Sequence, residues 1–106
     1  MTDVGNLPKM RSVKALENYV LQIQWDSGLV TTVDLSDMIA AGGVFTFLRD
    51  EKNLGQAKLG ARRRTVEWVE PGQDVVDMDA DTLLQMAQDQ MFFKRLARAL
   101  GQQPAP

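Results

Sequence analysis

A regular alternation of apolar and polar side chains over Tyr19–Trp25 is the feature that most constrains how this chain can fold. A period of two is typical of a strand that buries one face and exposes the other. The Asp-Ser-Gly loop at 26–28 then suits a tight turn, because glycine readily adopts a positive φ. Leu29–Asp34 returns as a strand rich in Val and Thr. The pattern predicts an antiparallel hairpin whose buried positions include Leu21, Ile23 and Trp25.

Other segments extend this hairpin into an α+β fold. Arg11–Leu16 is expected to be a further strand, and Gln56–Leu59 with Thr65–Val69 is expected to form a second hairpin in which Trp68 is buried. A short helix beginning at Asp34 or Ser36 ends at Gly42-Gly43, followed by a dense apolar turn over Val44–Leu48 and a solvated exit over residues 49–52. We predict a small, mostly antiparallel sheet of about five strands with this short helical insertion and a C-terminal helix.

The C-terminal helix is expected to begin at Asp79, a favoured N-cap residue, with Asp81 in its first turn. A regular helix would present its two apolar stripes on different faces. Either the chain breaks near residues 89–90, or one helix continues and shows its second apolar face to another molecule. The first stripe is Leu83, Leu84, Ala87 and Met91, and the second is Phe93, Leu96, Ala97 and Leu100.

The 106 residues leave room for one domain and a short extension. We expect residues 1–10 to be a flexible arm, residues 11–91 to form the α+β domain, and residues 92–106 to be a helix extension with a disordered tail. No apolar run approaches the ~20 residues of a membrane span, and the first residues lack the features of a signal peptide. We therefore expect a bacterial cytoplasmic protein.

Two absent residue types lower the expectation of catalysis. The chain has no cysteine and no histidine, so it lacks a thiolate nucleophile, the usual general base near neutral pH and the commonest ligands of zinc, copper and iron. Carboxylates, lysines and one tyrosine remain. We predict that the protein is not an enzyme and that it uses no cofactor and no metal.

A series of acids precedes the last helix, at Asp74, Asp77, Asp79 and Asp81. Several oxygens in one loop would suit a hard cation. However, a calcium-binding loop would need a central glycine and a final bidentate acid, whereas here Gly72 precedes the acids and apolar residues interrupt them. We favour a helix N-cap within a solvated acidic turn.

Two groups of cations are candidate contacts for anions or nucleic acid: Arg62, Arg63 and Arg64, and Lys94, Arg95 and Arg98. Guanidinium groups bind phosphate bidentately, but three consecutive residues of a hairpin cannot all face one side, and a charged edge or pairing with nearby acids is the simpler interpretation. The second group would complement the dipole of its own helix. The candidate interface residues for a protein partner or a second copy are Phe92, Phe93, Leu96 and Leu100.

Several short motifs follow one another along the chain: Trp25-Asp26-Ser27-Gly28, Val33-Asp34-Leu35, Gly43 to Asp50, and Thr65-Val66-Glu67-Trp68 followed by Gly72 and Asp74. Their order resembles that of the small bacterial proteins called domain of unknown function 2442. The resemblance covers roughly Val13 to Met86, and it implies a compact domain of a sheet and helices, without an activity or catalytic residues. Members resemble the N-terminal halves of some helix-turn-helix proteins, and many are encoded near small toxin–antitoxin-like partners.

These observations favour a non-enzymatic interaction or regulatory accessory module that self-associates through its last helix. The alternative is a nucleic-acid-binding regulator, of the transcriptional or toxin–antitoxin-like kind, that uses both groups of cations. A net charge of −2 gives the whole molecule no electrostatic attraction to nucleic acid. A carboxylate-dependent hydrolase is the least favoured of the three classes.

Overall fold

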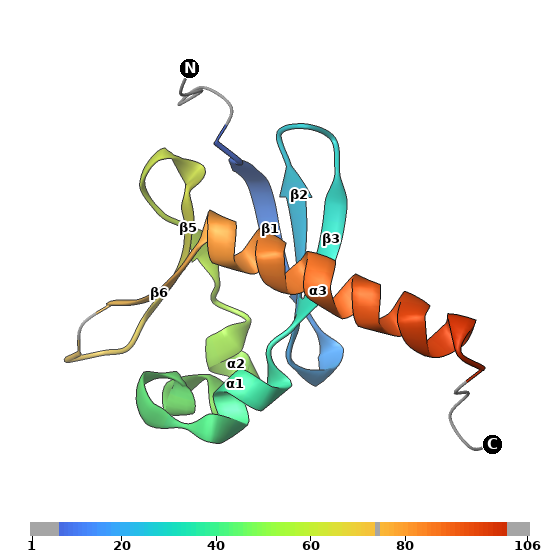
Figure 1. Ribbon diagram of the computed structural model, residues 1–106. Coiled ribbons are helices and arrows are strands. Elements are labelled where there is room, and N and C mark those ends of the chain that lie inside the picture. The colour runs from blue at the N-terminus through green and yellow to red at the C-terminus, as the bar shows by residue number, and fades with distance from the viewer. Residues whose placement is uncertain (1–6, 74, 102–106) are drawn as a thin grey trace.

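The computed structural model describes residues 7–73 and 75–101, which form two three-stranded antiparallel sheets, a helical segment and a long C-terminal helix (Figure 1). The predicted α+β class is therefore confirmed. The strands divide into two sheets of three, where the sequence led us to expect one sheet of about five. The predictions made for residues 1–6, Asp74 and residues 102–106 lie outside the described residues.

The first sheet contains the hairpin that the alternating pattern predicts. Its order is β1 (Met10–Leu16), β2 (Val20–Trp25) and β3 (Val30–Asp34), and the short η2 turn (Glu17–Tyr19) joins the first two. Leu21, Ile23 and Trp25 of β2 are buried, and Trp25 donates a hydrogen bond from Nε1 to Thr31 Oγ1 at 3.0 Å. β1 begins at Met10, inside the expected arm, and Met10 is fully buried opposite Trp25.

The second sheet contains the other predicted hairpin, with one strand that we did not expect. Its order is β4 (Lys58–Leu59), β5 (Thr65–Val69) and β6 (Val75–Asp79), and η4 (Ala61–Arg63) forms the turn between the first two strands. Trp68 of β5 is fully buried, as predicted, and donates from Nε1 to the backbone carbonyl of Leu54 at 3.0 Å.

β6 corrects our interpretation of the acidic segment before the last helix. The segment is a strand with Val76 and Met78 buried and Asp77 exposed on the opposite face. The alternation is hard to recognise from the sequence, because two adjacent valines at 75–76 interrupt it and the acids suggest a solvated turn. The acids of β6 are therefore the outer positions of an amphipathic strand.

The helical insertion comprises α1 (Ser36–Ala41), η3 (Gly43–Arg49) and α2 (Glu51–Leu54). The Arg49 side chain donates to the Ala40 carbonyl at 3.1 Å at the end of α1, and Asp50 caps α2 by accepting from the Lys52 backbone N–H at 2.9 Å. Arg49 and Asp50 thus hold the backbone at the end of α1 and at the start of α2. One expectation was wrong, because Val44 is 67% exposed. Residues 49–52 are exposed as expected, although Glu51 begins α2, a helix that we did not predict and that buries Leu54.

The last helix, α3 (Ala80–Ala99), is continuous, which decides the question that the two apolar stripes left open. Asp79 occupies the predicted N-cap position, although its side chain makes no capping hydrogen bond. α3 continues directly from β6 and crosses the first sheet, burying Ala80, Leu83 and Ala87, and its last turns extend beyond β3 (Figure 1).

Candidate interaction surface

A hydrogen-bonded clamp fixes α3 to the edge of the first sheet. The side-chain amide of Gln90 accepts a hydrogen bond from the Asp34 backbone N–H at 2.9 Å and donates one to the Asp34 carbonyl at 3.0 Å. Gln90 therefore mimics a neighbouring strand at the end of β3, where the backbone groups of an edge strand lack a partner. Nothing in the local sequence pattern distinguishes this glutamine from its neighbours, and we did not predict its role.

The helix beyond Gln90 exposes the predicted interface residues to solvent. The exposed fractions are 58% for Phe92, 64% for Phe93, 40% for Leu96 and 63% for Leu100. The Phe92 and Phe93 rings pack edge to face, with centroids 5.4 Å apart and planes at 73°. The four side chains, here called the outer face of α3, form an apolar surface that the described part of the domain leaves open.

The outer face lies opposite the packed stripe because of helix geometry. Each residue turns an α-helix by about 100°, so Leu96 and Leu100 lie on the side of the axis away from Ala80 and Ala87. The sheets cannot cover both sides of one helix. A single continuous α3 thus has one face spent on the core and a second available to another molecule.

The cations of α3 occupy a different face from these apolar residues. Lys94, Arg95 and Arg98 lie on the rotational sector that continues the packed stripe past the edge of β3. Within residues 7–73 and 75–101, none of the three forms an ion pair. Lys94 lies beside Asp34 and Asp37 in a shallow surface hollow.

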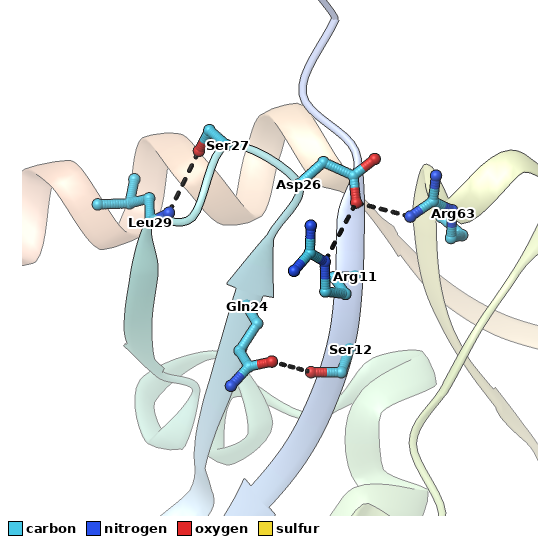
Figure 2. A network of polar contacts seen from close by, with 7 residues as sticks. All are labelled: Arg11, Ser12, Gln24, Asp26, Ser27, Leu29 and Arg63. Atoms are coloured by element: carbon cyan, nitrogen blue, oxygen red, sulfur yellow. Dashed lines mark hydrogen bonds and ion pairs between the residues drawn. The ribbon is translucent and has the colours of Figure 1, made fainter.

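Two of the arginines around η4 hold parts of the domain together. Arg63 donates from Nη1 to the Asp26 carboxylate at 2.6 Å, and the same carboxylate lies 3.9 Å from Arg11 Nε (Figure 2). Arg64 donates to Asp81 at 3.1 Å and to the Pro8 carbonyl. These contacts agree with the pairing interpretation and use the donors that an anion would need.

The structure does not bring the two groups of cations together. Arg64 meets α3 at Asp81, in its first turn, whereas Lys94 lies thirteen residues further along the helix, about 20 Å away at 1.5 Å per residue. Arg62 and Arg63 both adopt positive φ, at 58° and 57°, so the three arginines also diverge locally. A single basic patch made of all six residues is therefore not formed.

The described residues offer little for acid–base or metal chemistry. No group of three Asp or Glu side chains in the described parts of the chain is placed to hold a metal ion.

The pKa of Asp34 is lowered by hydrogen bonds from Ser36, and Lys94 lowers it further, while burial opposes both. This carboxylate accepts a hydrogen bond from the backbone N–H of Ser36, the first residue of α1, at 2.8 Å. In the described residues, no helix has both the length and the apolar character needed to cross a membrane.

The fold and this surface define a small α+β domain with an exposed amphipathic helix end. The chain belongs to the family described as "Protein of unknown function (DUF2442)", whose model matches residues 10–89. The family membership suggested by the sequence motifs is confirmed.

One solved structure gives a similar fold, the crystal structure of a "Putative DNA Binding Protein" from Nitrosomonas europaea ATCC 19718. The TM-score is 0.68 with 24% sequence identity, over 80% of this chain and 52% of that chain. This likeness shows a shared fold, and the chain spans about half the length of its neighbour. No curated protein matches the chain.

Proposed function

We propose that this domain is a non-enzymatic interaction module that pairs with a second copy through the outer face of α3. The observation that carries the proposal is the exposure of Phe92, Phe93, Leu96 and Leu100 on a helix end that extends beyond β3 (Figure 1). Large apolar side chains gathered on one exposed face favour association with another apolar surface.

A second copy fits this face better than a charged partner. Ala97 and Ala99 flank the outer face and are small enough to let two helices approach closely. Asp89 lies on the same sector one turn before it, and its carboxylate accepts a hydrogen bond from Gln85 at 2.9 Å. Because the helix end is clear of the sheets, two such ends can lie side by side under a two-fold axis, each presenting the same patch to the other.

The size of the face predicts a weak, concentration-dependent dimer. Four side chains of this exposure offer about 400 Å² of apolar surface per copy. A dimer burying roughly twice that lies below the usual range of stable interfaces. We therefore expect a dissociation constant of roughly tens of micromolar or weaker, because loss of rotational and translational freedom opposes so small an interface.

Sedimentation equilibrium over a range of protein concentrations tests this proposal. The variant Phe92→Ser/Phe93→Ser is expected to remain monomeric at concentrations where the wild-type chain dimerises. The matched control, Lys94→Ser/Arg95→Ser, alters two adjacent positions of the same helix off the outer face and should dimerise like the wild type. Equal association of all three proteins would remove the proposal.

The absence of catalysis is part of the same proposal and rests on the chain's chemistry. The chain contains no His or Cys, and the conspicuous acids Asp26, Asp34 and Asp81 are engaged in contacts within the domain. Turnover of a small substrate that a single Asp or Glu substitution abolished, in a variant that still folds, would overturn this part.

Nucleic-acid binding is the second candidate, and one observation favours it. Lys94, Arg95 and Arg98 gather on one sector of α3, and the Nitrosomonas europaea protein with the same fold carries a DNA-binding description. Three phosphate contacts would give weak, salt-sensitive affinity. Fluorescence anisotropy with duplex DNA at low salt tests this candidate, because binding by it should disappear in Lys94→Ala/Arg95→Ala/Arg98→Ala.

A further inference from the structure

The free edge of β6 offers a second surface, on another part of the domain from the outer face of α3. β6 is the last strand of its sheet, in the order β4-β5-β6. The Ala80 N–H donates to the Arg64 carbonyl at 2.7 Å, which continues the ladder beyond the pair of Thr65 with Asp79. Backbone groups alternate in direction along an antiparallel strand, so Met78 and Val76 also bond toward β5.

The alternation places the backbone groups of Asp77 on the open edge. The N–H and C=O of this residue point away from β5, and the same alternation sends the Val75 carbonyl and the Asp79 N–H outward. Within the described residues, none of these four groups has another backbone partner. An extended segment can use such groups to add a strand to the sheet.

A groove follows the same edge. It has a volume of about 740 Å³ and lies between η3 and the first half of β6. Because Val75 and Val76 point to opposite faces of the strand and both line the groove, it runs along the strand edge. The exposed Val44 gives its opposite wall an apolar side chain. The groove therefore places apolar side chains next to backbone N–H and C=O groups that can pair with an added strand.

The charge along this edge is negative. Asp77 lies directly opposite Glu67 in the register of β5 and β6, and like charges in that position destabilise a sheet. Glu70 also lines the groove. No ion pair in the described parts of the chain involves any of these three carboxylates. A cation next to Asp77 would relieve a repulsion that the domain leaves in place.

The same charges argue against a second copy as the occupant. Two β6 edges paired antiparallel would bring Asp77 close to the acids of the other copy, adding to the repulsion already present. We propose that the β6 edge and its groove bind an extended segment of another protein in which Lys or Arg alternates with apolar residues. The cations would face Asp77, and the apolar side chains would enter the groove beside Val44 and Val76.

Nuclear magnetic resonance titration with short capped peptides tests this proposal on the intact chain. A peptide alternating Arg and Val is expected to shift the amide signals of Asp77 and Asp79 and to slow their hydrogen exchange. A peptide alternating Glu and Val should bind at least about tenfold more weakly. Methylating the backbone nitrogens on the pairing edge of the Arg peptide should abolish binding, because it removes the donors for the sheet.

A charge reversal separates this site from simple attraction to an acidic protein. Asp77→Lys should weaken the Arg peptide and strengthen the Glu peptide, whereas the matched variant Asp37→Lys, on α1, should change neither by more than about twofold. Binding that tolerates backbone methylation, that Asp37→Lys weakens as much as Asp77→Lys does, or that is undetectable for the Arg peptide would overturn the proposal. The Phe92→Ser/Phe93→Ser variant should bind the peptide normally, so the two surfaces are tested separately.

Discussion

The amide of Gln90 hydrogen-bonds to both backbone groups of Asp34, although the two residues are 56 positions apart in the chain. This contact pairs the last backbone groups on the open edge of β3. It also marks the boundary between the part of α3 that packs on the sheet and the part that extends beyond it. The outer face begins two residues later, at Phe92. The clamp thus links the packing of the sheet to the exposure of the candidate interface.

Replacing Gln90 with Leu should destabilise the domain by about 1 kcal/mol, because two hydrogen bonds are lost at a site that water can still reach. Urea unfolding measures the change. Hydrogen exchange of the Asp34 amide should become faster in the same variant. Gln88→Leu, at an exposed position of the same helix, is the control and should leave the Asp34 amide protected. Unchanged exchange in Gln90→Leu would contradict the clamp.

The arginines of η4 should differ in their effect on stability. Arg64→Ala removes contacts with both Asp81 and the Pro8 carbonyl, and we expect a loss of about 1 kcal/mol. Arg63→Ala breaks an exposed ion pair with Asp26 and should cost about 0.5 kcal/mol. Thermal unfolding at low and high salt measures both. A larger loss for Arg63→Ala than for Arg64→Ala would show that the contacts are assigned the wrong weights.

Arg62→Gly is expected to stabilise the domain. Arg62 has a φ of 58°, a left-handed conformation that costs a non-glycine residue about 1 kcal/mol. Glycine removes this strain and adds backbone entropy to the unfolded chain, so the net gain should be about 0.5 kcal/mol. Arg62→Ala, which keeps the strain, is the matched control for equilibrium unfolding. If glycine proves less stable than alanine, the strained conformation is not formed.

Asp34 should make part of the stability dependent on acid pH. Its folded pKa lies below its ordinary value of 3.8, chiefly because of hydrogen bonds from Ser36. The stabilisation is therefore fully present well above pH 3.8 and is lost as the pH falls through the folded pKa. Solvent screening at this exposed site limits the effect to about 0.5 kcal/mol. Asp34→Asn should reduce the dependence of unfolding free energy on pH in this range, and Asp37→Asn should not.

Short-range patterns predicted much of the fold. The alternation around Leu21 and Ile23 specified the first hairpin, and the burial of Trp68 followed from the second. β6 was missed because Val75 is apolar yet exposed, which breaks the alternation that identifies a half-buried strand. β6 pairs with β5 across a short turn, but the division of the strands into two sheets depends on contacts between distant segments, which local periodicity does not contain.

The sequence predicted which residues form the outer face of α3, but it did not predict how the helix and the cations are arranged around it. The second apolar stripe indicated an exposed face at Phe93, Leu96 and Leu100, and the structure exposes all three. Whether α3 was continuous could not be decided from the pattern, because a broken helix and a single helix with two apolar faces fit the same residues. The contact that holds α3 at Gln90 joins it to a strand distant in sequence. The separation of Arg64 from Lys94 by most of the length of α3 likewise depends on tertiary packing.

Oxidative cross-linking through one introduced cysteine tests the central claim most directly, because the natural chain has no thiol. Ala97→Cys places a thiol beside the outer face, and the control Gln56→Cys places one on the exposed loop after α2. We predict a covalent dimer from Ala97→Cys that Phe92→Ser/Phe93→Ser suppresses, with little dimer from Gln56→Cys. Equal cross-linking of both cysteines, or cross-linking through Ala97→Cys that survives loss of the two phenylalanines, would contradict pairing through α3.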